Sequence, residues 1–247
     1  KAGLPLPNYG TRDELAADGK TINKRINTAD VWLGGVRYVF PAELVSSTGY
    51  PAHNPNRFNK LHGTLPHFYP KGPHAPVKDG MGAMVDVSFV CSLEPEFLER
   101  VRKQPRIRTL EEGVQYSVDM YKTTLARDPS LKGEVTHSIR EDLGMIEVLM
   151  KRNAGRKEFW GEATYWPIKT PLRKPDGTLG AIECQTQHVP NDPQAYGGRG
   201  WTCGAGFGLS PGASVGVSIY VAHIEHMPHV FEQVKQVVIN ARERGEK

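Results

Sequence analysis

Residues 214–244 constrain the fold most, because two hydrophobic periods follow one another there. Every second residue from Val215 to Val221 is Val or Ile, a period of two that predicts a strand with one buried face. After Pro228 the apolar residues recur every three or four positions, which predicts a helix with one apolar stripe. Such a helix must lie against the sheet. The sequence therefore predicts an α+β fold, a mostly antiparallel sheet with a few helices packed on it.

The strand-then-helix pair occurs twice along the chain, at 83–103 and at 214–244. A chain of 247 residues can form one large domain or two lobes of ordinary size. We expect a polar lead-in arm over residues 1–29 and an α+β domain over 30–247. The alternative is two similar lobes, at 30–130 and 131–247.

Shorter signals predict further elements. Apolar residues on both sides of Gly34-Gly35 predict a hairpin or a kinked strand, and Asp176-Gly177 predicts the turn of another hairpin. The other expectations are a helical turn over 13–17, a strand over 83–91, a helix over 94–103 and a strand over 114–125.

Two loops carry unusual residues. Residues 46–80 mix prolines, histidines and aromatics without a period, which is typical of an ordered loop that forms either a recognition surface or a packed cover. Residues 189–200 form a Pro/Gly-rich loop, and Trp201 after it is an interface residue or a core residue. Interfaces are enriched in aromatic residues and Arg. The candidate partner-binding residues are Arg57, Phe58, His67, Phe68, Tyr69, Tyr196, Arg199 and Trp201.

Charge and hydropathy exclude some classes of protein. The net charge of +4 is spread among acidic residues, whereas a nucleic-acid-binding protein usually carries a denser basic patch. The sequence has no apolar run near 18 residues, so we expect a soluble chain without a membrane span. It also lacks a Gly-x-Ser-x-Gly nucleophile motif, and its Gly-rich segments lack the context of a nucleotide loop. We predict no catalytic residues and no cofactor.

The histidines raise the question of a metal site. His223, His226 and His229 follow a spacing of three, but Pro228 divides them between a strand end and a helix start. We therefore interpret them as solvated histidines and predict no metal ligands. The alternative is a metal-dependent hydrolase that uses this cluster or the loop histidines. The loop histidines that it would use are His53, His62 and His67.

The three cysteines offer one pairing. Cys184 and Cys203 lie in two β-like segments on either side of a Pro/Gly-rich loop, where antiparallel strands could bring their Cβ atoms together. The pair forms a disulfide or stays as two buried thiols. Cys91 ends an apolar run and is interpreted as a core thiol.

At Asp30–Pro41 and at Val215–Val238 the sequence resembles exported immunity proteins that protect Gram-negative bacteria from type VI secretion phospholipase effectors. The likeness lies in the order of parts: a polar lead-in, an apolar entry strand ending in Phe40-Pro41, mixed middle segments, and a closing strand with an amphipathic helix.

The resemblance implies a protein that is not an enzyme and that neutralises a phospholipase by binding it. It implies a periplasmic protein, soluble or lipid-anchored, with a signal peptide upstream of Lys1, and such a compartment favours the pairing of Cys184 with Cys203. The hypothesis is therefore a periplasmic inhibitor whose loops occlude a phospholipase. Besides the metal-dependent hydrolase, another alternative is a glycan-binding or small-ligand-binding module. Its stacking faces would be Trp160, Tyr165, Trp166 and Trp201.

Overall fold

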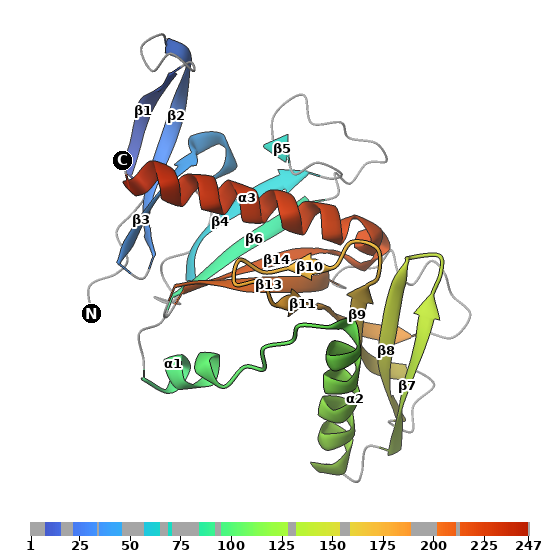
Figure 1. The fold of residues 1–247 in the computed structure, drawn as a ribbon. Coiled ribbons are helices and arrows are strands. Elements are labelled where there is room, and N and C mark those ends of the chain that lie inside the picture. The colour runs from blue at the N-terminus through green and yellow to red at the C-terminus, as the bar shows by residue number, and fades with distance from the viewer. Residues whose placement is uncertain are drawn as a thin grey trace. The chain divides into compact units, whose positions relative to one another are not determined.

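The structure is a computed structural model. It describes residues 8–15, 22–33, 35–45, 57–64, 69–70, 84–91, 95–127, 132–153, 159–188, 202–210 and 213–246. The chain divides into two compact units, and each has its own strands and helices (Figure 1). Unit 1 comprises residues 1–104, 208–217 and 233–247, and unit 2 comprises residues 105–207 and 218–232.

Unit 1 is built mainly from strands of the first third of the chain. Its elements are β1 (Asn8–Leu15), β2 (Ile22–Leu33), β3 (Val36–Pro41), η1 (Ala42–Leu44), β4 (Arg57–Thr64), β5 (Tyr69–Pro70), β6 (Met84–Cys91) and α1 (Pro95–Arg102). One sheet has the order β1-β2-β3. Another set of strands has the order β5-β4-β6-β14, where β14 is Ala213–Tyr220 and contributes residues up to Val217.

Of the two alternatives expected around Gly34-Gly35, a hairpin or a kinked strand, the structure has the hairpin. β2 and β3 pair antiparallel from Leu33↔Val36 onward, and Gly35 has a φ of 81°, which a glycine adopts without strain. Tyr38 and Phe40 on β3 are both buried, and their rings stack with centroids 6.1 Å apart. The hairpin thus supplies part of the core of unit 1.

Two sequence expectations in unit 1 are wrong. The helical turn over 13–17 is not formed, because residues 13–15 continue β1 and pair with β2. Residues 46–80 are not structureless throughout, because they contain β4 and β5. A bulge in the pairing of β4 with β6, between Phe58 and Leu61, interrupts the period of two that would have revealed β4.

Unit 2 contains a sheet with the order β13-β12-β9-β8-β7. Its strands are β7 (Lys132–Arg140), β8 (Met145–Asn153), β9 (Phe159–Pro167), β12 (Ile182–His188) and β13 (Thr202–Ser210, up to Phe207 in this unit). The small hairpin of β10 (Leu172–Arg173) and β11 (Leu179–Gly180) turns at Gly177, as predicted. Helix α2 (Leu110–Arg127) contacts β7, β8 and β9.

The strand predicted over 114–125 is wrong, since this segment lies inside α2. A capping box begins the helix: the backbone N–H of Glu112 donates to Thr109 Oγ1 at 3.1 Å, and the Glu112 carboxylate accepts from the N–H of Thr109 at 3.3 Å. Gly113, Ser117 and Tyr121 then recur every four residues as the buried stripe. The Thr-x-x-Glu pattern of a capping box was visible in the sequence. It indicates the helix correctly, whereas the alternation over 114–125 suggested a strand.

Residues 213–246 form the strand and the helix that the sequence predicted, although the strand ends at Tyr220 and a 3-10 helix begins at Val221. β14 buries Ala213, Val215, Val217 and Ile219, and its alternating burial confirms the strand. It is followed by the 3-10 helix η3 (Val221–His226) and by α3 (Met227–Glu246). The apolar stripe of α3 is buried, and Pro228 lies in its first turn.

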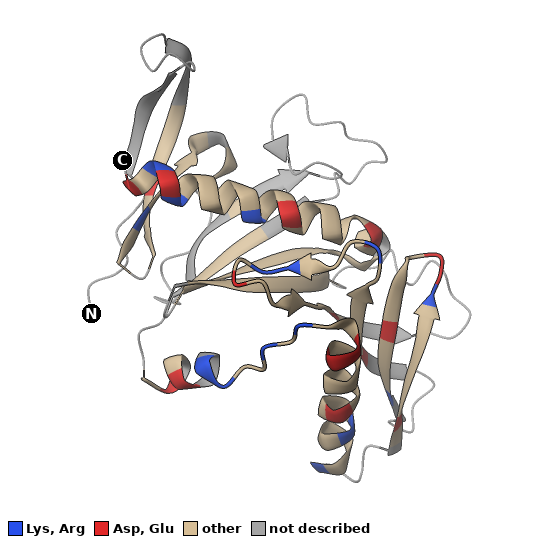
Figure 2. Ribbon diagram, in the orientation of Figure 1, with Lys and Arg blue, Asp and Glu red and all other residues tan. Residues whose placement is uncertain are grey.

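These elements confirm a mostly antiparallel α+β fold, and every strand pairing whose register is described is antiparallel. Charged residues of both signs are mixed along α3 (Figure 2). None of the described helices combines the length and the apolar character needed to cross a membrane.

Candidate functional site

The open edge of the sheet in unit 2 is formed by β7. All nine residues of this strand pair with β8, from Lys132↔Asn153 to Arg140↔Met145. β7 is the last strand in the order, so its outer side has no strand partner among the described residues. The outer N–H and C=O groups of such an edge can pair with an extended segment of another protein.

A row of apolar side chains crosses the sheet to this edge. Ile139 on β7 is directly opposite Ile146 on β8, and Ile146 is opposite Trp166 on β9, so the three side chains share one face. Exposure changes sharply along the row: Trp166 is 2% exposed, Ile146 is partly buried and Ile139 is 64% exposed. The row therefore begins in the core and ends in solvent.

Helix α2 covers the inner end of this row. The indole N–H of Trp166 donates to Ser117 Oγ at 3.0 Å, and that hydroxyl donates to the carbonyl of Gly113 at 3.1 Å. A Cβ atom at Gly113 would lie 2.6 Å from the ring of Trp166, so only glycine permits this approach. The helix is held over β9, while Ile139 at the open edge stays uncovered.

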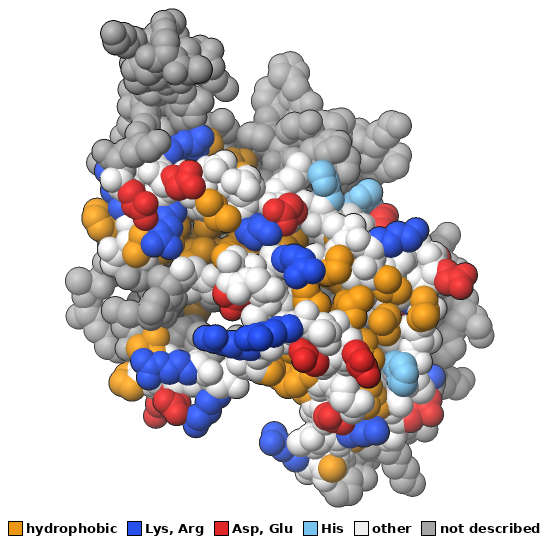
Figure 3. All heavy atoms as spheres, viewed as in Figure 1, with side chains coloured by type: hydrophobic (Ala, Val, Ile, Leu, Met, Phe, Trp, Pro, Cys, Tyr) orange, Lys and Arg blue, Asp and Glu red, His pale blue; other side chains and the backbone are white. Residues whose placement is uncertain are grey.

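Further apolar exposure lies near the turn between β7 and β8. Ile168 is 37% exposed, and its N–H donates to the carbonyl of Gly144 in this turn at 3.0 Å. Figure 3 shows hydrophobic side chains gathered over β7 and β8 beside α2. We call the outer backbone of β7 together with Ile139, Ile146 and Ile168 the edge surface.

A polar network fixes the turn beside the edge surface. The guanidinium of Arg140 donates to the carboxylate of Asp142 at 2.7 and 3.0 Å and to Glu147 at 3.3 Å. The hydroxyl of Tyr165 donates to the same Glu147 oxygen at 2.6 Å. Hydrogen bonding from Arg140 lowers the pKa of Asp142 below its usual value. These charges therefore stabilise the end of β7 that carries Ile139.

The loop residues predicted to bind a partner lie mostly outside the described residues. Arg57 and Phe58 are on β4 and Tyr69 is on β5, but their side chains are not described. The structure describes nothing of the other five, His67, Phe68, Tyr196, Arg199 and Trp201. Their role in binding stays a prediction.

Sequence reasoning missed the edge surface. The signal was present as Val135, His137 and Ile139, which alternate with polar residues and so indicate a strand. Nothing in that pattern shows that the strand lies at an edge, because strand order depends on pairings with residues distant in the sequence. The exposure of Ile139 follows from that order.

The structure gives the exposure of two of the four aromatic residues that were proposed to stack on a ligand. Tyr165 is 6% exposed and Trp166 is 2% exposed, so both belong to the core and offer no open face. The side chains of Trp160 and Trp201 lie outside the described residues. A module that stacks a sugar on Tyr165 or Trp166 is therefore excluded.

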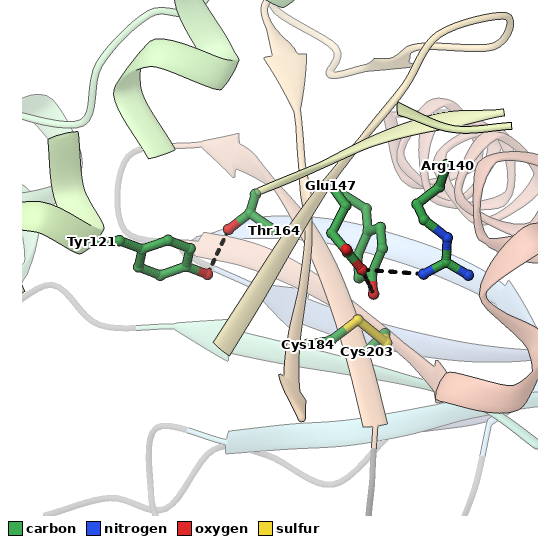
Figure 4. The surroundings of a disulfide bond; sticks show 7 residues. Tyr121, Arg140, Glu147, Thr164, Cys184 and Cys203 are labelled. Atoms are coloured by element: carbon green, nitrogen blue, oxygen red, sulfur yellow. Dashed lines mark hydrogen bonds and ion pairs between the residues drawn. A yellow bond between two sulfur atoms is a disulfide. The ribbon is translucent and has the colours of Figure 1, made fainter. Parts of the chain in front are cut away.

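Cys184 and Cys203 form a disulfide in unit 2 (Figure 4). The two residues are directly opposite one another on β12 and β13, with Cα atoms 4.2 Å apart. Both are buried, and Phe207, which follows on the same face of β13, packs edge to face on Phe231 of α3 at 5.3 Å. The disulfide thus lies in the core on the face opposite α2. The side chain of Cys91 lies outside the described residues.

Comparison with known proteins gives one structural likeness to report. No family model matches the chain, and no curated protein matches it. The fold is similar to that of Smlt3025, an immunity protein of the Stenotrophomonas maltophilia type IV secretion system, with 16% sequence identity and a TM-score of 0.46. The match covers 90% of this chain and 97% of the other.

Proposed function

We propose that this chain is a non-enzymatic immunity protein that binds a secreted phospholipase toxin of a type VI system and blocks its active site. The observation that carries the proposal is the edge surface, a strand edge without a strand partner in the described part of the chain, beside an apolar side chain that is 64% exposed. Soluble proteins usually protect such edges with charges or cover them. β7 does carry charged residues, among them Glu134 and Arg140, but the exposed side chain of Ile139 offers an apolar contact to a protein partner.

The chemistry of the edge surface defines what it would bind. Its backbone groups fit an extended segment of the toxin, added as a further strand to β7. Ile139 and Ile146 lie on one face, so alternate side chains of that segment would be apolar. The toxin would be inhibited because the bound chain denies phospholipid access to its active site. The predicted loop residues would make contacts of their own with the toxin: Arg57, Phe58, His67, Phe68, Tyr69, Tyr196, Arg199 and Trp201.

The disulfide supports an exported protein. Disulfides persist in the periplasm but are reduced in the cytosol. The sequence resemblance to periplasmic immunity proteins points to the same compartment, and we include a signal peptide and a lipid anchor upstream of Lys1 in the proposal. The solved structure matched above is an immunity protein as well, but the proposal rests on the surface and on the sequence resemblance.

Thiol trapping tests the compartment. The chain has three cysteines, and we expect one to react with a thiol reagent when the denatured protein comes from the periplasm of cells expressing the full gene. Reduction with dithiothreitol should raise the number to three. Recovery of the chain in the cytosol with three reactive thiols would refute the export part of the proposal.

The cognate phospholipase, sought first among the genes that adjoin this chain's gene, tests the function itself. We expect the purified chain to form a complex with it and to abolish phospholipid hydrolysis at equimolar concentration. Unhindered hydrolysis in excess of the chain would end the proposal. The variant that tests the edge surface is Ile139→Asp, which places a charge where apolar contact is needed. We expect at least a tenfold loss of affinity, which corresponds to about 1.4 kcal/mol.

The matched control for this variant is Trp32→Asp. Trp32 is 51% exposed on β2 in unit 1, so the control makes the same apolar-to-acid change at an exposed position that is not part of the edge surface. It should inhibit the phospholipase like the unmodified chain. If both variants bind equally well, the toxin is held by another surface, even if the inhibitory function stands.

A further inference from the structure

A cluster of metal-ligating side chains lies where β14 passes into α3. η3 joins these two elements and belongs to unit 2. His223, Glu225 and His226 on η3 each offer one donor atom, and the three atoms lie within 4.8 Å of one another. Figure 3 shows histidine side chains on the surface beside the beginning of α3.

The backbone of η3 is kinked where the first of the two imidazoles lies. Two short helical pieces meet at His223, whose φ of −127° and ψ of 22° are not helical. The rings of His223 and His226 stack across this kink, with centroids 6.3 Å apart and planes inclined by 29°. The sequence expectation placed these residues in different elements on account of Pro228, but both lie in η3 before that proline.

The position of Glu225 agrees better with shared coordination than with a simple hydrogen bond. Its Oε1 lies 3.5 Å from Nε2 of His226, which is longer than the roughly 2.7–3.2 Å of a normal hydrogen bond. Two ligands of a tetrahedral zinc ion, each about 2.0–2.1 Å from the metal, lie about 3.3 Å apart. The pair is therefore already near ligand spacing, and side-chain rotation can bring His223 to the same distance.

We propose that His223, Glu225 and His226 bind Zn²⁺ with three protein ligands and a fourth position open to water. Two imidazoles and one carboxylate form a ligand set that zinc favours. The side chains of His226 and Glu225 are 39% and 47% exposed, so an ion can enter without a change in the fold. His229 lies on α3, outside the three-residue cluster, and is no part of the site.

Bound zinc would tie together the short segment between β14 and α3. All three ligands are within four residues of one another, so the ion stabilises η3 and the first turn of α3 that follows it. A ligand that binds the folded state alone raises stability in proportion to its occupancy. We expect the Tm of the full chain to rise with zinc concentration. This inference is independent of the proposed binding of a toxin.

Equilibrium dialysis of the metal-free full chain against zinc chloride, followed by elemental analysis, tests the site. We expect one zinc per chain that is lost on His223→Ala, His226→Ala or Glu225→Gln, each with at least a tenfold fall in affinity. Co²⁺ in place of zinc should give the intense visible absorption of a four-coordinate ion. The same three substitutions should abolish that absorption.

His137→Ala is the matched control, since His137 is an exposed histidine on β7 outside the cluster. It should leave zinc affinity unchanged, and circular dichroism should show that all four variants fold. Zinc that binds all three cluster variants as tightly as the unmodified chain is held by other histidines and overturns the proposal. A chain that binds no zinc at micromolar concentration overturns it as well.

Discussion

Trp166 and Ile139 lie in one row on one face of the same sheet, yet one is 2% exposed and the other 64%. The difference comes from α2, which reaches Trp166 through Gly113 and Ser117 but leaves Ile139 uncovered. Burial of the first side chain stabilises the fold, since each buried large apolar side chain contributes about 1.5–3 kcal/mol. The exposed side chain of Ile139 contributes little to this stabilisation and remains available for contact with a partner.

The two ends of the row should respond differently to mutation. Substitutions at the covered end change the free energy of unfolding, whereas a substitution at the open end changes binding. This separation distinguishes a surface meant for a partner from an incompletely covered core.

Trp166→Ala should lower the free energy of unfolding by about 3–5 kcal/mol, because it leaves a cavity under α2 and removes the hydrogen bond that Ser117 Oγ accepts from the indole. Urea denaturation followed by circular dichroism measures the change. Trp32→Ala, at a tryptophan that is 51% exposed, is the control and should cost much less. Equal losses at the two positions would contradict the contrast in burial.

Gly113→Val should cost about 1–3 kcal/mol, because the new side chain would meet the ring of Trp166 and push α2 away from β9. The same denaturation experiment measures it. Lys122→Val introduces the same side chain at an exposed position of α2 and should cost about 0.5 kcal/mol or less. A Gly113 variant as stable as the Lys122 variant would show that the helix does not approach Trp166 this closely.

Thr109→Ala should cost about 1 kcal/mol by removing the hydroxyl that accepts from the N–H of Glu112. Thr123→Ala is the control, since Thr123 is exposed within α2, where alanine favours the helix and should stabilise it slightly. Thermal melts of both variants should therefore shift in opposite directions. A shift of both in the same direction would count against the capping box.

Glu183→Gln tests a carboxylate on the α2 face of β12. Glu183 reaches solvent, but protein atoms crowd its carboxylate, and this burial raises its pKa, with a smaller contribution from Glu162. A raised pKa means that ionised Glu183 destabilises the folded state, so wild-type stability is lost as the pH rises through that pKa. Removing the charge should raise the Tm at pH 7 by roughly 1–2 °C.

The pH dependence provides the check on this variant. At a pH below the ordinary carboxyl pKa of about 4.3, Glu183 is protonated in both states and the gain from glutamine should disappear. Melts of the two proteins across this range give the comparison. A gain that is as large at low pH as at pH 7 would show that the charge is not its cause.

Hydrophobic periods and turn residues predicted the elements whose structure depends on neighbouring residues in the sequence. The period of two in β14, the stripe of α3 and the turn at Gly177 each depend on neighbouring residues and were predicted correctly. The helix α2 was not predicted, although Thr109 and Glu112 form the capping box that begins it. The alternation of apolar and polar residues over 114–125 was given more weight. That error is one of interpretation.

The candidate sites were harder to predict because they depend on strand order and on backbone geometry. Ile139 is exposed only because β7 is last in the order of unit 2, which no local pattern specifies. His223 and His226 come together across a kink, where the φ and ψ of His223 are not helical. The spacing of three was visible in the sequence, but it does not reveal that kink.

The most direct test of the central claim is the affinity of the Ile139→Asp chain for the toxin that it is proposed to inhibit, measured by isothermal titration calorimetry together with the unfolding curve of the variant. We predict at least a tenfold loss of affinity with a change in unfolding free energy below about 0.5 kcal/mol. An unchanged affinity, or a loss explained by unfolding, would contradict the claim that the open end of the row is kept for a partner.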